Sequence, residues 1–447
     1  MNSIVSVLQR YALLVLAAAG ALVPRPAAAE LLTLEQAVGR ALQNNPGIRA
    51  AEAQVDAAQA GVLRSSSGFL PKVTLSETWS RTDNPMMVLG TKLNQEIVAP
   101  ADFAPSVMND PEALSNYNTR MAVMQPLFNG GKEYLGVTQS KLARDAAVKD
   151  RERTRQETVF QVVKAYYSVL LSKEYHAVAT RSLETSTENV RLTETRYRAG
   201  AVLQSDLLRA RVQAAEVREM VTRAESGIKL AKANLAYAMG TPQQDDIEID
   251  GTLAPREPSK ELVAATGEAL AGRPDLAALD LNRKNAEAGV RQARTDYLPT
   301  VNLMGQMDWN SDRFAGNDAR SWAVMAVVSW NIFDGMATTA NVRQAAAAAG
   351  RVRAMEEQMR SAVELQVKQS YYSLQASRDR IEATATSVQE AEEGLRIVQK
   401  RYESGMTTFV DVLGAESALI RARTSALQAL YDNNVADAEL RLATGAL

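Results

Sequence analysis

The chain of 447 residues carries a long internal duplication, which restricts its fold more than any other feature of the sequence. Residues 34–46 match residues 262–274 at an offset of 228, and Tyr166-Tyr167 matches Tyr371-Tyr372 at an offset of 205. The difference of 23 residues is an insertion in the first copy, between residues 80 and 118. One structural unit is therefore expected twice, as a first repeat at 30–240 and a second at 261–447.

Each copy contains long stretches without proline that are rich in Ala, Glu, Gln, Arg and Leu, all strong helix formers. They predict helices at 131–199 and 203–239 in the first copy, and at 336–404 and 408–444 in the second. The first helix would be about 100 Å long, at about 1.5 Å per residue. A seven-residue apolar repeat, typical of left-handed coiled coils, runs along the second copy. Its members are Ile381, Val388, Leu395, Tyr402 and Phe409.

Two further segments in each copy have the composition of strands, at about 71–81 and 117–128 and at about 299–310 and 320–333. They are rich in Val, Thr, Trp and Met, and several alternate apolar and polar residues, as outer-membrane strands do. The proline-rich residues 82–116 are expected to form an irregular extracellular loop. Tryptophan favours both strands and membrane interfaces. All four tryptophans lie in these segments and are predicted to form a membrane belt: Trp79, Trp309, Trp322 and Trp330.

Residues 1–29 are predicted to be a signal peptide. Arg10 gives a positive start, residues 11–23 are apolar, and residues 27–29 are three alanines suited to cleavage. No later stretch has eighteen uninterrupted apolar residues, so no transmembrane helix is expected. An exported chain of this kind is periplasmic, secreted or a β-barrel.

The composition argues against an enzyme and against any cofactor. The chain contains no cysteine, which excludes thiolate metal sites and a cysteine nucleophile. The single histidine, His176, is expected in the core or at a helix seam rather than on a metal. No phosphate-binding loop or nucleophile–base pair is found. The net charge of −2 lacks the basic stripe of a nucleic-acid binder.

Four strands are too few to close a barrel, and lipid does not tolerate an open sheet edge. Two copies would give eight strands, whose interior is filled by side chains, whereas three copies would give twelve, an even number with room for a pore. Helices of about 100 Å exceed a membrane core of about 30 Å and must project into the periplasm. The expected fold is mainly α with a β-barrel segment: duplicated strand hairpins and long coiled-coil helices, forming a trimeric twelve-stranded outer-membrane barrel continuous with a periplasmic α-helical barrel.

Arg-Tyr-x-x-Gly-x5-Asp-x-Leu occurs at 196–208 and again at 401–413. With the Leu-Pro before the first strand of each copy and the closing Phe-Asn-Gly-Gly and Phe-Asp-Gly, the chain resembles the TolC-type outer-membrane efflux protein family over about residues 31–445. The resemblance implies a homotrimer, seated in outer-membrane lipid, with a periplasmic membrane-fusion (adaptor) protein and an inner-membrane pump of RND or ABC type as partners. It also places residues 241–260 as a linker at an equatorial collar.

Glycine is common just after a helix C-terminus, so Gly200 and Gly405 predict the tips of two helical hairpins. The resemblance implies that these tips face the adaptor. The tip residues are Ala199, Gly200, Ala201, Ser404, Gly405 and Met406.

Asp206 and Asp411 each follow a tip glycine by six residues. One interpretation is helix capping, since Thr408 and Asp411 fit a capping box and Asp206 suits a helix start. The other is a gate, in which threefold symmetry makes each Asp a ring that favours cations. The resemblance implies gate bonds at Asp206 and Tyr402, with Thr407 in place of an arginine partner and Gly414 in place of a second acidic residue.

The predicted function is that of an outer-membrane channel in a tripartite efflux system, passively exporting small molecules, drugs or metal ions. It would be a multi-pass β-barrel with a large periplasmic portion. One alternative is the exit duct of a type I protein secretion system. Another is an exported coiled-coil structural protein without a pore.

Overall fold

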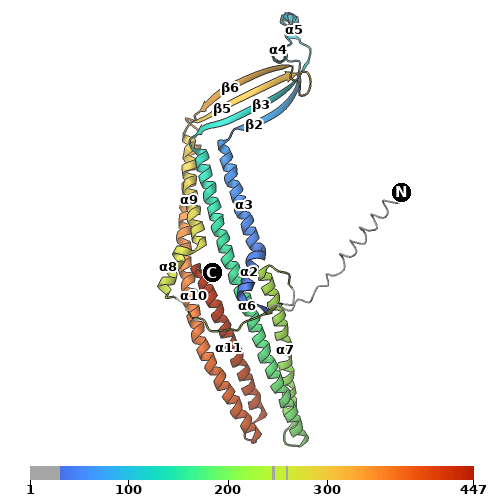
Figure 1. Cartoon of the computed structure of the whole chain (residues 1–447), viewed down its shortest axis with the longest axis vertical. Coiled ribbons are helices and arrows are strands. Elements are labelled where there is room, and N and C mark those ends of the chain that lie inside the picture. The colour runs from blue at the N-terminus through green and yellow to red at the C-terminus, as the bar shows by residue number, and fades with distance from the viewer. Residues whose placement is uncertain (1–30, 244–246, 258–259) are drawn as a thin grey trace, which may run out of the picture.

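The computed structural model describes residues 31–243, 247–257 and 260–447, so the predicted signal peptide lies outside the described residues. The molecule is elongated, with a sheet at one end and two helical hairpins at the other (Figure 1). Its mainly α composition with four antiparallel strands agrees with the fold class expected from the duplication. Within the described part of the chain, no helix is both long enough and apolar enough to cross a bilayer.

Each copy contributes one antiparallel strand hairpin to a single sheet. The strands are β2 (Lys72–Thr82), β3 (Leu114–Asn129), β5 (Thr300–Ser311) and β6 (Ala319–Ser329), in the order β2-β3-β5-β6. The two hairpins are joined through β3 and β5, and β2 and β6 are left as the edges. The register of β3 shifts between Pro126 and Phe128, where proline has no N–H for the ladder.

The last strand is shorter than the predicted 320–333. It ends at Ser329, and Trp330 follows it as an exposed side chain whose indole N–H donates to the carbonyl of Tyr297 at 3.1 Å. Beyond it the chain turns into the next helix, because the Asp334 carboxylate accepts the backbone N–H of Thr338 at 2.7 Å. The alternation of apolar and polar residues alone does not show that the strand ends at this point.

The strand register gives the sheet two chemically different faces. On one face Asn116 donates to Asn310 at 2.9 Å, and Arg120 pairs with Asp308 at 2.6 Å. The other face is mostly apolar, with Glu77 and Arg320 among its charged members, and the register places three of the four tryptophans on it. Its large side chains include Val73, Leu75, Trp79, Trp309, Trp322, Val324 and Val328.

Four long helices form two hairpins whose tips lie at the end opposite the sheet (Figure 1). The first hairpin consists of α6 (Lys132–Arg198) and α7 (Gln204–Met239), and the second of α10 (Ala337–Glu403) and α11 (Phe409–Thr444). Since α6 and α10 have 67 residues each, they are about 100 Å long. His176 of α6 is half-buried at the seam with α7, its Nε2 3.7 Å from a carboxylate oxygen of Glu225.

The matching openings of the two copies are helical, which the sequence analysis did not predict. They form α2 (Leu34–Asn44) and α3 (Pro46–Ser66) in the first copy, and α8 (Leu262–Gly272) and α9 (Pro274–Arg294) in the second. Proline occupies the first position of α3 and of α9, where its missing N–H is not needed. A 3₁₀ turn then leads into each first strand: η1 (Ser67–Phe69) and η3 (Thr295–Tyr297).

The predicted irregular loop at 82–116 is wrong in part, because it contains helices. These are α4 (Pro85–Asn94), the 3₁₀ turn η2 (Pro100–Phe103) and α5 (Pro105–Asn109). Each begins with proline, so residues taken as breakers start short helices instead. An ion pair between Lys92 and Asp102, at 2.7 Å, holds α4 against the 3₁₀ turn.

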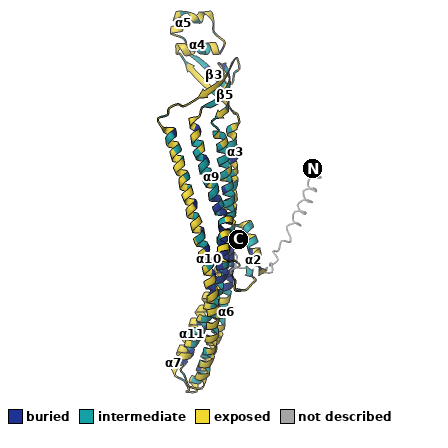
Figure 2. Cartoon of the chain, turned by 90° about the vertical axis from the view of Figure 1, so that its left-hand side faces the viewer, coloured by how far each residue is buried: buried dark blue, intermediate teal, exposed yellow. Residues whose placement is uncertain are grey.

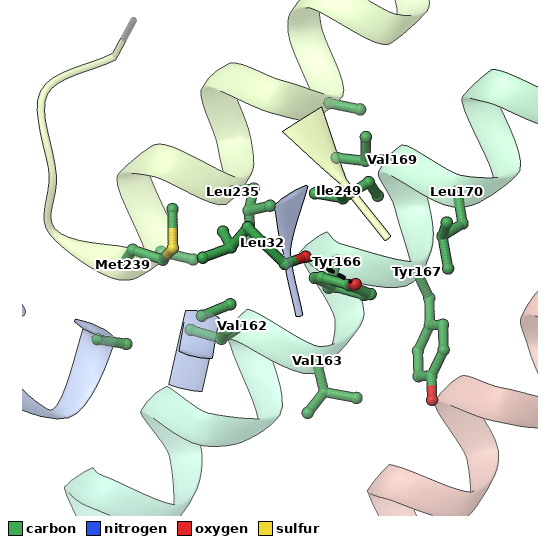
Figure 3. Close-up of a cluster of buried hydrophobic side chains, with 14 of the residues drawn as sticks. Leu32, Val162, Val163, Tyr166, Tyr167, Val169, Leu170, Leu235, Met239 and Ile249 are labelled. Atoms are coloured by element: carbon green, nitrogen blue, oxygen red, sulfur yellow. Dashed lines mark hydrogen bonds between the residues drawn. The ribbon is translucent and has the colours of Figure 1, made fainter. Parts of the chain in front are cut away.

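The largest core lies around the middle of the long helices, where Figure 2 shows buried residues gathered near the C-terminus. It packs Leu32 of β1 (Leu31–Leu32) and Ile249 of β4 (Glu248–Ile249) against α6 and α7 (Figure 3). Tyr166 ties these parts together, since its hydroxyl donates to the carbonyl of Leu32 at 3.0 Å and also contacts that of Asp250. Burial raises the pKa of Tyr166 to about 12. The pairing of β1 with β4 thus fastens the inter-repeat linker beside the helices.

Candidate functional site

The two hairpin tips have the same turn geometry. Gly200 has a φ of 71°, and Gly405 has a φ of 72°, both in the left-handed region that glycine favours. Ala201 N–H donates to the carbonyl of Arg196 at 2.9 Å, and Met406 N–H donates to that of Arg401 at 2.8 Å. This is the Schellman ending of a helix. The six predicted tip residues are all exposed, with Met406 the largest apolar side chain among them.

Asp411 is the N3 residue of a helix cap at the start of α11. It forms the capping box that was one of its two interpretations, with Thr408 as the N-cap residue of α11. The hydroxyls of Thr407 and Thr408 donate to its Oδ2 at 2.6 and 2.7 Å. These hydrogen bonds, that from Thr407 first, lower the pKa of Asp411 to about 2. The carboxylate is therefore ionised and held at the start of α11.

Asp206 is not a cap, which corrects that interpretation for the first hairpin. It lies in the first turn of α7, where the N-cap residue is Leu203 and provides no side-chain hydrogen bond. The half-exposed carboxylate of Asp206 makes no hydrogen bond or ion pair with the rest of the described chain. The helix dipole still favours a negative charge at this position.

The gate bond expected between Asp206 and Tyr402 is absent within the described residues. The Tyr402 hydroxyl is buried and has no hydrogen-bond partner there. Its ring contacts Phe409, with centroids 5.5 Å apart, and the guanidinium of Arg196 lies 5.1 Å from the ring centroid. Arg196 belongs to α6 and Tyr402 to α10, so a cation–π contact joins the two hairpins near their tips.

An apolar cluster supports this junction. Its buried members are Ala210 of α7 together with Phe409 and Val412 of α11, and Tyr402 packs beside them. The hairpins are thus held together near the tips by packing and by the Arg196 guanidinium. Sequence reasoning placed Tyr402 and Phe409 in the seven-residue repeat but did not identify Arg196 as their partner.

A second inter-hairpin contact, which sequence reasoning missed, lies further from the tips. Asn189 of α6 donates to the Glu416 carboxylate of α11 at 2.5 Å, and Glu416 is only 6% exposed. Burial raises the pKa of Glu416, and the hydrogen bond from Asn189 opposes that shift. The signal was available: Phe409, Val412, Glu416 and Leu419 follow the 3-4 spacing of a coiled-coil seam, and all four are buried.

The described residues contain no group of three or more His, Cys, Asp or Glu side chains able to hold a metal ion. The arrangement at the tips has two features that chemistry can use. It offers one fixed carboxylate, that of Asp411, and it offers a seam between the hairpins whose contacts can separate without breaking a covalent bond.

The profile of the Outer membrane efflux protein family matches residues 37–241 and 265–446, so the chain belongs to that family. The resemblance to TolC-type proteins drawn from the Arg-Tyr motifs is thereby confirmed. The chain is an outer-membrane channel protein with a large periplasmic part, and not an enzyme.

Three relatives whose names indicate different functions are about equally similar to this chain. BepC of Brucella suis, an outer membrane efflux protein, is 24% identical over 423 residues, covering 92% of this chain and 85% of BepC. AprF of Pseudomonas aeruginosa, an alkaline protease secretion protein, is 25% identical over 420 residues, covering 91% and 83%. CzcC of Cupriavidus metallidurans, a cobalt-zinc-cadmium resistance protein, is 24% identical over 408 residues, covering 90% and 86%.

Solved structures share the fold. A membrane protein from Pseudomonas aeruginosa superposes with a TM-score of 0.79 at 21% identity, covering 92% of this chain and 93% of that one. The outer membrane protein VceC from Vibrio cholerae gives 0.76 at 20% identity, covering 92% and 96%.

Proposed function

We propose that three copies of this chain form one outer-membrane channel, which passively exports small molecules, drugs or metal ions within a tripartite efflux system. The observation that carries the proposal is the open, two-faced sheet. Its edge strands β2 and β6 have 11 residues each, so β6 of one copy can pair with β2 of the next along its full length. Three four-stranded sheets joined in this way close a barrel of twelve strands, with the apolar face toward lipid and the polar face toward the pore.

The tryptophans support the same orientation. Trp79, Trp309 and Trp322 lie toward the loop end of the sheet, and Trp330 lies at the end where the helices begin. Two aromatic positions at opposite ends of the strands suit the two interfaces of a bilayer. The helical hairpins then extend into the periplasm as a tunnel, with the linker between repeats at its middle.

The hairpin tips are proposed as the docking site for a periplasmic adaptor protein, which would connect the channel to an inner-membrane pump of RND or ABC type. The gate would lie just above them and would include Asp206, Tyr402, Thr407 and Asp411. The buried, unpartnered hydroxyl of Tyr402 supports this, because a closed trimer whose hairpins shift to give that hydroxyl a partner would gain about 1–3 kcal/mol.

The experiment has two parts. Light scattering of the detergent-purified protein should give three times the protomer mass, and planar bilayers should show discrete conductance steps. A stable monomer, or a trimer that never conducts, contradicts the proposal. A deletion strain then separates the cargo classes: raised sensitivity to drugs or metal salts supports efflux, whereas loss of one secreted protein with unchanged sensitivity supports the secretion duct suggested by AprF.

A further inference from the structure

Three methionines lie side by side on neighbouring strands of the sheet. Met124 of β3 is paired with Met304 of β5, and Met304 is paired with Met325 of β6. Side chains directly opposite each other in antiparallel strands lie on the same face, with Cβ atoms about 4.5–5.5 Å apart. The three thioethers therefore form one row across three strands, called here the methionine row.

The methionine row lies on the polar face of the sheet. Gln306 and Asp308 follow Met304 at intervals of two along β5, so their side chains share its face. On that face Arg120 pairs with Asp308, and Asn118 donates to Asp308 and to Asn310, each at 3.2 Å. This face carries amides and ions along β3 and β5, and the neighbouring apolar side chains on it, Ala122, Ala323 and Val327, have no donor atom. The three methionines therefore supply the soft donor atoms of this part of the face.

A thioether differs from other apolar groups in carrying a soft sulfur donor. Sulfur ligands of this type select soft ions such as Cu(I), whereas carboxylate and carbonyl oxygens suit hard cations. Three methionines from adjacent strands also have long, flexible side chains, which can bring three sulfur atoms around one ion.

We infer that Met124, Met304 and Met325 form a binding site for a soft monovalent cation, Cu(I) or Ag(I), on the wall of the pore. This inference rests on the proposed function, because closing the barrel directs the polar face toward the pore. The site lies toward the end of the sheet from which the helices extend, where a cation rising through the tunnel would enter the barrel (Figure 1).

Nearby charge favours a monovalent ion. Lys72 at the edge of the sheet is paired with Met124, so an ammonium group borders the row. Thioethers are neutral and leave the full charge of the metal in place. Since Coulomb repulsion scales with charge, Lys72 opposes a divalent ion twice as strongly as a monovalent one. The Arg120–Asp308 ion pair is neutral as a unit, so it adds little repulsion for either kind of ion.

The test is a silver titration of the purified trimer in detergent, with methionine methyl groups labelled with carbon-13 and observed by NMR. Silver(I) in a chloride-free buffer is the probe, and single Met→Leu variants assign the resonances. We expect the methyl signals of Met124, Met304 and Met325 to shift together, and Met124→Leu/Met304→Leu/Met325→Leu to lose the response. Lys72→Gln should move the response to lower silver concentration.

The chain offers a matched control. Met121 and Met307 are also directly opposite each other, but on the apolar face. Met121→Leu/Met307→Leu should keep the silver response. The inference is overturned if the triple variant responds as the wild type does, if the control variant loses the response as well, or if zinc(II) shifts the same methyl groups at equal concentration.

Bilayer conductance without silver separates this inference from the proposed function. The triple variant should conduct as the wild type does, because leucine keeps the apolar volume of each position. A conducting wild type that does not bind silver ends the inference and leaves the channel proposal standing. A wild type that never conducts ends the channel proposal, whatever silver does.

Discussion

Asn189 of α6 and Glu416 of α11 join the two helical hairpins through a hydrogen bond of 2.5 Å inside their seam. Glu416 occupies a position at which the coiled-coil pattern predicts an apolar side chain. It borders a cavity of about 60 Å³, which is also lined by Ser186, Arg181 and Arg423. A buried carboxylate with one hydrogen-bond donor is poorly solvated. The seam that must part for the hairpins to move therefore contains a group whose charge opposes its closure.

Glu416→Gln should tighten this seam at neutral pH. Glutamine can still accept from Asn189, but no charge has to be buried. We expect the midpoint of thermal unfolding to rise by a few degrees at pH 7, measured by circular dichroism of the detergent-solubilised protein. Glu390→Gln is the control, because Glu390 is an exposed residue of α10. A midpoint that falls in Glu416→Gln alone would contradict this account.

The pH dependence of this stabilisation follows from the direction in which the pKa of Glu416 is shifted. Burial raises the pKa of Glu416 above its ordinary value of 4.5. The stabilisation that comes with protonation is fully present below pH 4.5 and is lost as the pH rises through the raised pKa. The advantage of Glu416→Gln over the wild type should therefore be largest at neutral pH and disappear on acidification.

Thr408→Ala should loosen the start of α11. The substitution removes the N-cap hydroxyl, worth about 1 kcal/mol, so amide exchange in the first turn should be roughly fivefold faster. Thr386→Ala, at an exposed mid-helix site on α10, is the control and should leave that turn unchanged. Because the pKa of Asp411 is lowered to about 2, its contribution is present above pH 3.8 and is lost as the pH falls toward 2. Equal exchange in Thr408→Ala and wild type at pH 7 would rule out this capping role.

Much of the fold could be predicted because its signals are local. The lack of proline between residues 132 and 199 and the seven-residue repeat both lie within single elements, and they identified the long helices. The strand pairing is different in kind. Asn116 meets Asn310 across 194 positions, so which side chains share a face depends on how the two copies associate. That association also assembles the methionine row.

The candidate site was predicted less completely, for a related reason. The capping box at Asp411 is a local motif and was predicted as one of two interpretations. Arg196 and Tyr402 meet only because α6 and α10 converge, and neither the stacking nor the unpartnered hydroxyl has a signature in the sequence. The helix that starts at Pro46 was missed because helices were predicted only from long proline-free stretches, whereas proline is the first residue of this helix.

Gly240→Ala should be much more damaging than the same change at Gly445, its counterpart in the second copy. Both glycines end a long helix with positive φ, 70° and 78°, so alanine meets the same backbone strain of about 1–2 kcal/mol at each. At Gly240 a Cβ would lie 2.7 Å from Asn45 Cα, whereas at Gly445 the nearest atom is at 3.4 Å. In denaturant unfolding, the free energy of unfolding of Gly240→Ala should be clearly lower than that of Gly445→Ala. Equal losses of stability in the two variants would show that the end of α2 can move away from residue 240 without cost.

The proposed gate predicts one effect on stability and another on conductance when its residues are changed. In the protomer the Tyr402 hydroxyl is buried without a partner, so Tyr402→Phe should leave the stability unchanged or raise it slightly. If the closed trimer supplies a partner to that hydroxyl, the same variant should conduct more in planar bilayers, and so should Asp206→Ala. Tyr197→Phe is the matched control, since Tyr197 is its repeat counterpart on α6 and is exposed at 39%. Unchanged conductance in both Tyr402→Phe and Asp206→Ala would exclude a gate at these residues, leaving the stacking of Arg196 and the apolar cluster as the contacts that hold the hairpins together near their tips.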